Sequence, residues 1–231
     1  MKEFLRNNAF FCTCWLLVLL AMVTALVVVP KAELHMALNA WHCPALDVFF
    51  RYYTQFVQWP VYVLMLLPLL GLLPRWKGKE CLKPIWTALF AAAEALSALI
   101  SQLIKHIWNM PRPKTFFEDL QEYVLPVVEG VHMHSWHSFP SGHTASFFVF
   151  FSLCAFIYAG EGRPYKHLFG FMCLILALLG GYSRIYLSQH FLLDVCVGMV
   201  NGTLVSAAVY VFFSAKNFFI HSNKANLCSA K

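Results

Sequence analysis

A short polar turn stands directly before one of the most apolar stretches of the chain. Pro140, Ser141, Gly142 and His143 precede the run TASFFVFFSLCAFIYA. Pro140 turns the chain, Ser141 can cap a helix that begins here, and Gly142 allows close approach to the backbone. The free N–H groups and the positive end of the helix dipole would then face one point, which makes the turn a candidate phosphate site. The alternative is an ordinary Pro-Ser helix start that a histidine happens to follow.

The stretch SRIYLSQHFLLD contains a second candidate group. Asp194 follows His190 by four residues, which is one helical turn, so both side chains lie on the same face. An aspartate that accepts a hydrogen bond from one imidazole nitrogen fixes the tautomer and leaves the other nitrogen as a nucleophile. Ser183 and Arg184 precede this pair by a short turn. A purely structural His–Asp contact is the alternative, although an acid in so apolar a setting is costly without a partner.

Two cations make up the third candidate group. In the stretch KHIWNMPRP, Arg112 follows Lys105 by seven positions. This is close to two helical turns, so both side chains can project to one side before the prolines end the helix. Together they could bind an anion. Alternatively, the two side chains extend independently to the level of the lipid headgroups.

These three groups, in this order along the chain, resemble the motifs of the type-2 phosphatidic acid phosphatase family. The resemblance covers Lys105 to Asp194 directly and the remainder of the chain in layout alone. No motif position departs from the family's pattern. The matching positions are Lys105, six residues, Arg112 and Pro113; Pro140, Ser141, Gly142 and His143; and Ser183, Arg184, five residues, His190, three residues and Asp194.

The resemblance implies that phosphate is removed from a lipid phosphate or diphosphate through a phosphohistidine, with no metal and no cofactor. In that scheme His190 attacks phosphorus, Asp194 orients it, and His143 protonates the leaving oxygen and then activates water. Positioning and positive charge are what phosphoryl transfer mainly needs, and three cations beside a helix N-terminus supply both. The residues that would hold the phosphoryl oxygens are Lys105, Arg112, Ser141, Gly142 and Arg184.

The composition predicts the elements that position these residues. Hydrophobic residues make up 60% of the chain and charged residues 12%, whereas soluble domains carry about a quarter charged residues. We therefore predict an all-α membrane helix bundle, a single domain over residues 1–231, with about six transmembrane helices and an interfacial helix over 34–56. The N-terminal run predicts an uncleaved first span rather than a signal peptide. The apolar runs lie at roughly 9–29, 57–74, 85–104, 143–160, 167–183 and 191–213.

The basic residues predict the orientation of these spans. With about six spans, both termini and the loops that hold most of the lysines and arginines share one side, which the positive-inside rule assigns to the cytoplasm. The PSGH turn and the other candidate groups then face outward from a bacterial cytoplasmic membrane. The basic residues on this outer side are Lys31, Arg51, Lys105, Arg112, Lys114 and Arg184.

Several smaller signals stay open at this point. The segment HMHSWH could hold a metal, but histidines without a carboxylate or thiol are more often headgroup contacts or solvated side chains. Glu94 lies inside a predicted span and needs a partner that the sequence does not name. Asn201-Gly202-Thr203 fits a glycosylation acceptor, but its place inside a span favours helix packing. The histidines concerned are His132, His134 and His137.

The motifs leave the substrate and one reaction alternative open. Candidate substrates are undecaprenyl diphosphate, phosphatidylglycerol phosphate, phosphatidic acid and the phosphates of lipid A, so the expected partners are phospholipid, prenyl-lipid or glycolipid phosphates and the bilayer. The net charge of +6 follows membrane topology and does not indicate nucleic acid. A lipid phosphotransferase with the same phosphohistidine, and a non-catalytic protein that binds or flips phospholipids, are the alternatives. Vanadium haloperoxidases share the signature, but they are soluble.

Overall fold

The computed structural model describes residues 2–57, 83–121 and 123–228. Over these residues the regular elements are all helical, and five helices are long and apolar enough to cross a membrane. The all-α, multi-pass prediction is therefore confirmed, while the run predicted at 57–74 lies almost entirely outside the described residues. The five long helices are α1 (Lys2–Val28), α5 (Lys83–Ile107), α7 (Gly142–Gly160), α8 (Lys166–Tyr186) and α9 (Leu192–Cys228).

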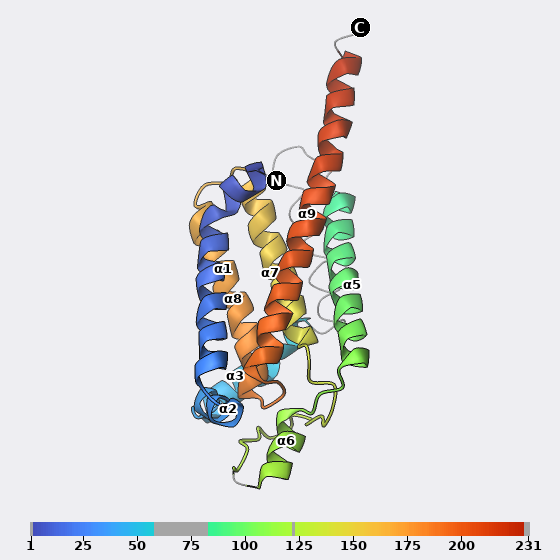
Figure 1. Ribbon diagram of the computed structural model, residues 1–231. Coiled ribbons are helices and arrows are strands. Elements are labelled where there is room, and N and C mark those ends of the chain that lie inside the picture. The colour runs from blue at the N-terminus through green and yellow to red at the C-terminus, as the bar shows by residue number, and fades with distance from the viewer. Residues whose placement is uncertain (1, 58–82, 122, 229–231) are drawn as a thin grey trace.

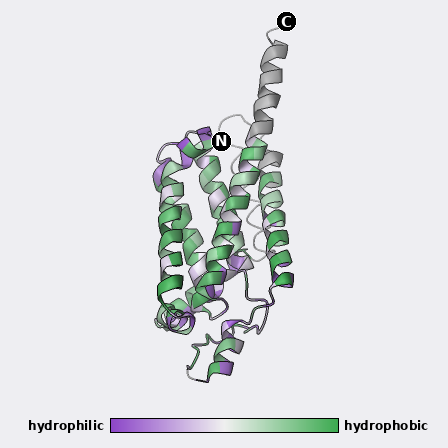
Figure 2. Ribbon diagram, in the orientation of Figure 1, coloured by the Kyte–Doolittle hydropathy of each residue, from purple (hydrophilic) through white to green (hydrophobic). Residues whose placement is uncertain are grey.

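The long helices stand side by side as a bundle in which α7 is central (Figure 1). Helix α7 packs against α8, α9, α5 and α1, and most of its residues are buried. This fits its sequence, because a helix that is hydrophobic all round belongs in the interior. Hydrophobic residues cover α1 and α5, whereas hydrophilic residues gather near the two ends of the bundle (Figure 2).

One end of the bundle gathers the helix ends that carry the three motifs. The C-terminal ends of α5 and α8 meet the N-terminal ends of α7 and α9 there, and both chain termini lie toward the other end (Figure 1). The short helix α6 (Pro113–Leu120) extends beyond the bundle at the motif end. The topology thus brings together groups that lie up to 89 positions apart between Lys105 and Asp194.

Small residues let α9 approach the start of α7 closely. A Cβ atom added at Gly198 would clash with the carbonyl oxygen of Ser141, and one added at Gly202 would clash with that of Ala145. The backbone N–H of Ser141 also donates a hydrogen bond of 3.0 Å to the carbonyl oxygen of Asp194. The first turns of α7 and α9, which carry two of the motifs, are therefore fixed against each other.

The segment predicted as one interfacial helix over 34–56 is divided. It forms α2 (Lys31–Leu38), α3 (Pro44–Tyr53) and the 3-10 helix η1 (Thr54–Val57). The division comes before Pro44, because a proline disfavours the helical conformation in the preceding residue and is well suited to the first turn of a new helix. All three elements contact α8.

Two polar residues inside the spans find partners on neighbouring helices. The side-chain amide of Asn201 on α9 lies 3.0 Å from the carbonyl oxygen of Ser97 and 3.0 Å from the hydroxyl of Ser101, both on α5. This arrangement supports the packing interpretation of the Asn-Gly-Thr segment. The hydroxyl of Ser146 on α7 donates a hydrogen bond to Glu94 on α5, which supplies the partner that the sequence could not name.

Candidate active site

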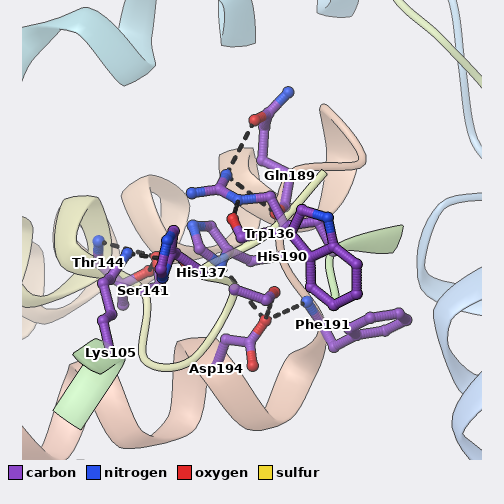
Figure 3. Close-up of polar contacts among 11 residues, drawn as sticks. Lys105, Trp136, His137, Ser141, Thr144, Gln189, His190, Phe191 and Asp194 are labelled. Carbon is purple, nitrogen blue, oxygen red and sulfur yellow. Dashed lines mark hydrogen bonds and ion pairs between the residues drawn. The ribbon is translucent and has the colours of Figure 1, made fainter. Parts of the chain in front are cut away.

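The three motifs meet at the end of the bundle opposite the termini (Figure 3). Lys105 lies in the last turn of α5 and Arg184 in the last turn of α8. Ser141 is the N-cap of α7, Asp194 lies in the first turn of α9, and His190 lies in the connection between α8 and α9. The helix ends thus bring together groups that the sequence predicted to act as one site.

His190 and Asp194 form a buried pair. The Nδ1 atom of His190 lies 3.3 Å from Oδ2 of Asp194, and neither residue is more than 4% exposed. The predicted contact is therefore present, although His190 precedes α9 (Leu192–Cys228) and does not share a helical turn with Asp194. Because Nδ1 faces the carboxylate, Nε2 is the nitrogen left for attack.

Burial also sets the protonation state of His190. The pKa of the imidazole is lowered to about 3, mainly by burial; the hydrogen bond with Asp194 raises it, and the charges of Arg112 and Arg184 lower it. An unprotonated ring at neutral pH follows from this balance. That is the state in which an imidazole can act as a nucleophile.

Two further donors hold the Asp194 carboxylate. The backbone N–H of Phe191 donates to Oδ2 at 3.0 Å, and the hydroxyl of Ser138 donates to the same oxygen. Figure 3 shows the N–H of Phe191 directed at the carboxylate. Ser138, which is fully buried two residues before Pro140, was not predicted from the sequence. Its closeness to the PSGH turn was the one signal that could have indicated it.

Arg112 is held by groups that aim it at the site. Its Nε atom donates to the carbonyl oxygen of Trp136 at 2.9 Å, and Nη1 lies 3.1 Å from Oε1 of Gln189. The side-chain amide of Gln189 in turn donates to the carbonyl oxygen of His132 at 3.0 Å. Burial lowers the pKa of Arg112, although nearby Asp194 opposes this effect. Gln189 therefore links the Arg motif to the loop before the PSGH turn, a role that the sequence did not reveal.

Arg184 forms a hydrogen bond with the segment between the first two predicted spans. Its Nη1 atom donates to the hydroxyl of Thr54 in η1 at 2.6 Å. Its Nε atom is buried and has no hydrogen-bond partner among the described residues. A guanidinium with an unused donor is suited to bind an oxyanion, because a buried N–H without a partner is costly. No sequence pattern indicated Thr54, which lies 130 positions before Arg184.

The start of α7 has the predicted cap. The hydroxyl oxygen of Ser141 accepts a hydrogen bond from the hydroxyl of Thr144 at 2.8 Å and a longer one from its backbone N–H. A Cβ atom added at Gly142 would meet nothing within 4 Å, so space is open beside this helix end. His143 follows directly and interacts electrostatically with Arg184 and His190. The structure thus brings the PSGH turn to the other two motifs.

Lys105 and the histidine-rich loop complete this end of the molecule. The ammonium of Lys105 donates to the carbonyl oxygen of His137 at 3.0 Å. The rings of His132 and His134 meet edge to face, with centroids 4.6 Å apart, and both side chains are exposed. Partial burial lowers the pKa of His134, as do the charges of Arg112 and other basic groups. Among the described residues, no three His, Cys, Asp or Glu side chains are grouped as metal ligands would be.

Known proteins are similar to this chain in sequence or in fold. Residues 86–218 match the PAP2 superfamily. The bacitracin transport permease protein BcrC of Bacillus licheniformis is 38% identical over 86 residues, which span 37% of this chain and 37% of that protein, well under two thirds of its length.

Two solved structures resemble the whole bundle. Aquifex aeolicus LpxE superimposes with a TM-score of 0.60 and 28% identity, covering 78% of this chain and 94% of that one. A transmembrane PAP2-type phosphatidylglycerolphosphate phosphatase from Bacillus subtilis superimposes with a TM-score of 0.61, covering 93% of this chain and 98% of that one; at 20% identity this likeness concerns the fold alone. The matched region contains all three motifs and more than half of the chain. The chain therefore belongs to the PAP2 superfamily, and it has the helical fold of a membrane-embedded PAP2 phosphatase.

Proposed function

We propose that this chain is a membrane lipid phosphatase that hydrolyses a lipid phosphate or diphosphate through a phosphohistidine on His190, without a metal. The observation that carries the proposal is the buried pair in which Asp194 occupies Nδ1 of His190. Arg112 and Arg184 act electrostatically on the same ring. A binding site needs only the cations, whereas an imidazole aligned by a carboxylate is what covalent chemistry needs.

The first half of the reaction forms the intermediate. The substrate phosphoryl group binds among Lys105, Arg112 and Arg184, beside the N-terminus of α7. Nε2 of His190 attacks phosphorus in line while the bond between phosphorus and the lipid oxygen breaks. His143 gives a proton to that leaving oxygen, and the lipid alcohol, or the lipid monophosphate when the substrate is a diphosphate, departs. Asp194 stabilises the positive charge that the phosphorylated imidazole carries.

The second half releases phosphate. His143, now unprotonated, takes a proton from water, and the water oxygen attacks the phosphorus of phosphohistidine. The bond between phosphorus and Nε2 breaks, its electron pair returns to the ring, and His190 is again neutral. The three cations stabilise the charge on the equatorial oxygens in both transition states. His143 therefore acts first as an acid and then as a base.

The position of the site in the bundle supports a substrate in the outer leaflet. The motif end lies opposite both termini (Figure 1), and the positive-inside rule assigns the termini to the cytoplasm. The site then faces the exterior of a bacterial inner membrane. The substrate candidates are phosphatidic acid, phosphatidylglycerol phosphate, undecaprenyl diphosphate and lipid A phosphates.

The test is phosphate release by the purified full chain from these lipids, measured in EDTA. We expect release to persist in EDTA and to fall to background in His190→Ala, because the variant lacks the nucleophile. His106→Ala is the matched control, since His106 is an exposed histidine in the last turn of α5, and its activity should equal that of the original chain.

Other outcomes would decide against the proposal. Release that EDTA abolishes, or that His190→Ala retains, would contradict histidine chemistry without a metal. Binding of a lipid phosphate with no turnover in either protein would indicate a lipid-binding protein. Phosphate found on an added acceptor lipid rather than in solution would identify a phosphotransferase.

A further inference from the structure

A cavity lies on the Asp194 side of the His190–Asp194 pair. Its volume is about 560 Å³, and its walls come from the end of α1, from α2, from the chain after α5 and from the start of α9. Of the eight predicted site residues, all of which the structure describes, Asp194 alone lines it. Because Asp194 faces Nδ1 of His190, this rear cavity is separate from the proposed phosphate site on the Nε2 side.

The mouth of the rear cavity is apolar and faces outward at the ends of the spans. Trp108, Met110 and Leu193 line the cavity, and about half of each side chain is exposed. Leu26 and Val29, at the end of α1, continue the apolar wall. At the end of a membrane-spanning bundle such a surface lies at the depth where acyl chains join their headgroups. A lipid chain is therefore the occupant that suits the walls.

The interior of the cavity contains a buried imidazole without partners. His35 is 2% exposed, and neither of its ring nitrogens has a hydrogen-bond partner among the described residues. Burial lowers its pKa to about 4, so the ring is neutral at pH 7 and has one donor and one acceptor. An unsatisfied buried polar group is costly, and a ligand hydroxyl can donate to the unprotonated nitrogen or accept from the protonated one.

The cation of Lys31 lies over two aromatic rings beside this cavity. The ammonium of Lys31 lies 3.8 Å from the ring centroid of Phe191 and 4.4 Å from that of Phe116. No carboxylate of the described residues forms an ion pair with Lys31. The side chain is exposed and lines the cavity, so it can bind an anionic group that arrives with a lipid chain.

We propose that the rear cavity binds a second membrane phospholipid, which does not react and whose anionic diester headgroup carries a hydroxyl, as in phosphatidylglycerol. The phosphodiester binds Lys31, the headgroup hydroxyl binds His35, and one chain lies against Trp108 and Leu193. No phosphate-binding residue of the catalytic site lines the cavity, so this lipid presents no phosphorus to His190. The assignment is independent of the proposed reaction.

The test uses quenching of Trp108 fluorescence by lipids with brominated chains, in nanodiscs that contain the full chain. The share of quenching that belongs to Trp108 is the part lost in Trp108→Phe. We expect brominated phosphatidylglycerol to quench this share at a several-fold lower mole fraction than brominated phosphatidylcholine, because Lys31 favours an anion. Phosphatidylmethanol, an anionic diester without a hydroxyl, should fall between the two.

Two variants separate the two headgroup contacts. Lys31→Gln should abolish the preference for phosphatidylglycerol over phosphatidylcholine, and His35→Leu should abolish only the preference over phosphatidylmethanol. Lys114→Gln is the matched control, because Lys114 lies at the same end of the molecule but does not line this cavity. Val29→Phe, which fills the cavity from its wall, should weaken quenching by all three lipids.

The following results would overturn the proposed lipid site. Equal quenching by phosphatidylglycerol and phosphatidylcholine, or a preference that survives in Lys31→Gln, would mean that only surrounding bilayer lipid is sensed. A preference over phosphatidylmethanol that persists in a folded His35→Leu protein would overturn the hydroxyl contact. Because the readout is binding, a failure here differs from a failure of phosphate release.

Discussion

Asp194 accepts hydrogen bonds on one carboxylate oxygen from His190, from the backbone of Phe191 and from Ser138. The three donors hold the carboxylate in place beside the imidazole. Two of them are local in sequence, and Ser138 comes from the chain before α7. The alignment of His190, the proposed nucleophile, therefore depends on the contact between two segments that are far apart in sequence.

Removal of the Ser138 hydroxyl tests this alignment. We expect Ser138→Ala to lower kcat about tenfold with little change in KM, because a hydrogen bond to a buried charge contributes more than a neutral one and Ser138 is not among the proposed phosphate-binding residues. Steady-state kinetics with a short-chain lipid phosphate measure both constants. Ser152→Ala, which changes a buried serine within α7, is the control. A rise in KM at constant kcat would instead place Ser138 in substrate binding.

The sequence predicted contacts between residues that are close along the chain, but it did not predict contacts between residues that are far apart. The His190–Asp194 pair joins residues four positions apart, and the Ser141 cap belongs to one helix start. Thr54 and Gln189 were missed because their roles depend on which side chain they meet after folding. A threonine or glutamine in a loop has no pattern that indicates an arginine partner.

At the scale of the elements, the helix ends determine where the motifs stand. The predicted spans at 143–160 and 167–183 correspond within three residues to α7 and α8, because a long apolar run has few alternatives in a membrane. The interfacial segment was less predictable, since it is half polar and contains Pro44. Composition alone does not determine where such a segment breaks.

Close packing of α9 on α7 gives a prediction at this scale. Gly202→Ala should lower the free energy of unfolding by about 1–3 kcal/mol, because its Cβ atom would clash with the backbone of Ala145. The melting temperature in detergent measures the loss. Activity should fall as well, since the displaced helices carry Ser141 and Asp194.

Gly142→Ala is the matched control for stability. Its added methyl meets nothing within 4 Å, so the melting temperature should stay unchanged, but kcat/KM should fall if phosphate occupies the open space at the start of α7. Equal melting temperatures for both glycine variants would contradict the close helix contact. Full activity in Gly142→Ala would place the phosphoryl group elsewhere.

At the scale of the whole molecule, the separation of the site from the termini permits a test of orientation. Cys43 is exposed between α2 and α3 at the motif end, and Arg163 lies in the connection of α7 to α8 at the other end. In an otherwise cysteine-free chain in intact cells, an impermeant maleimide should label Cys43. It should label an Arg163→Cys protein only after permeabilisation. The reverse pattern would place the site in the cytoplasm.

The position of Asp194 between the proposed phosphate site and the rear cavity has a thermodynamic consequence. Two ligands that act on one carboxylate do not bind independently, and linkage requires that each change the affinity of the other by the same factor. A lipid that raises the affinity of the protein for phosphate is itself bound with higher affinity when phosphate is bound. The lipid composition of the surrounding leaflet would then change the apparent affinity of the enzyme for its substrate. Phosphatase activity would therefore vary with the lipid composition of the membrane.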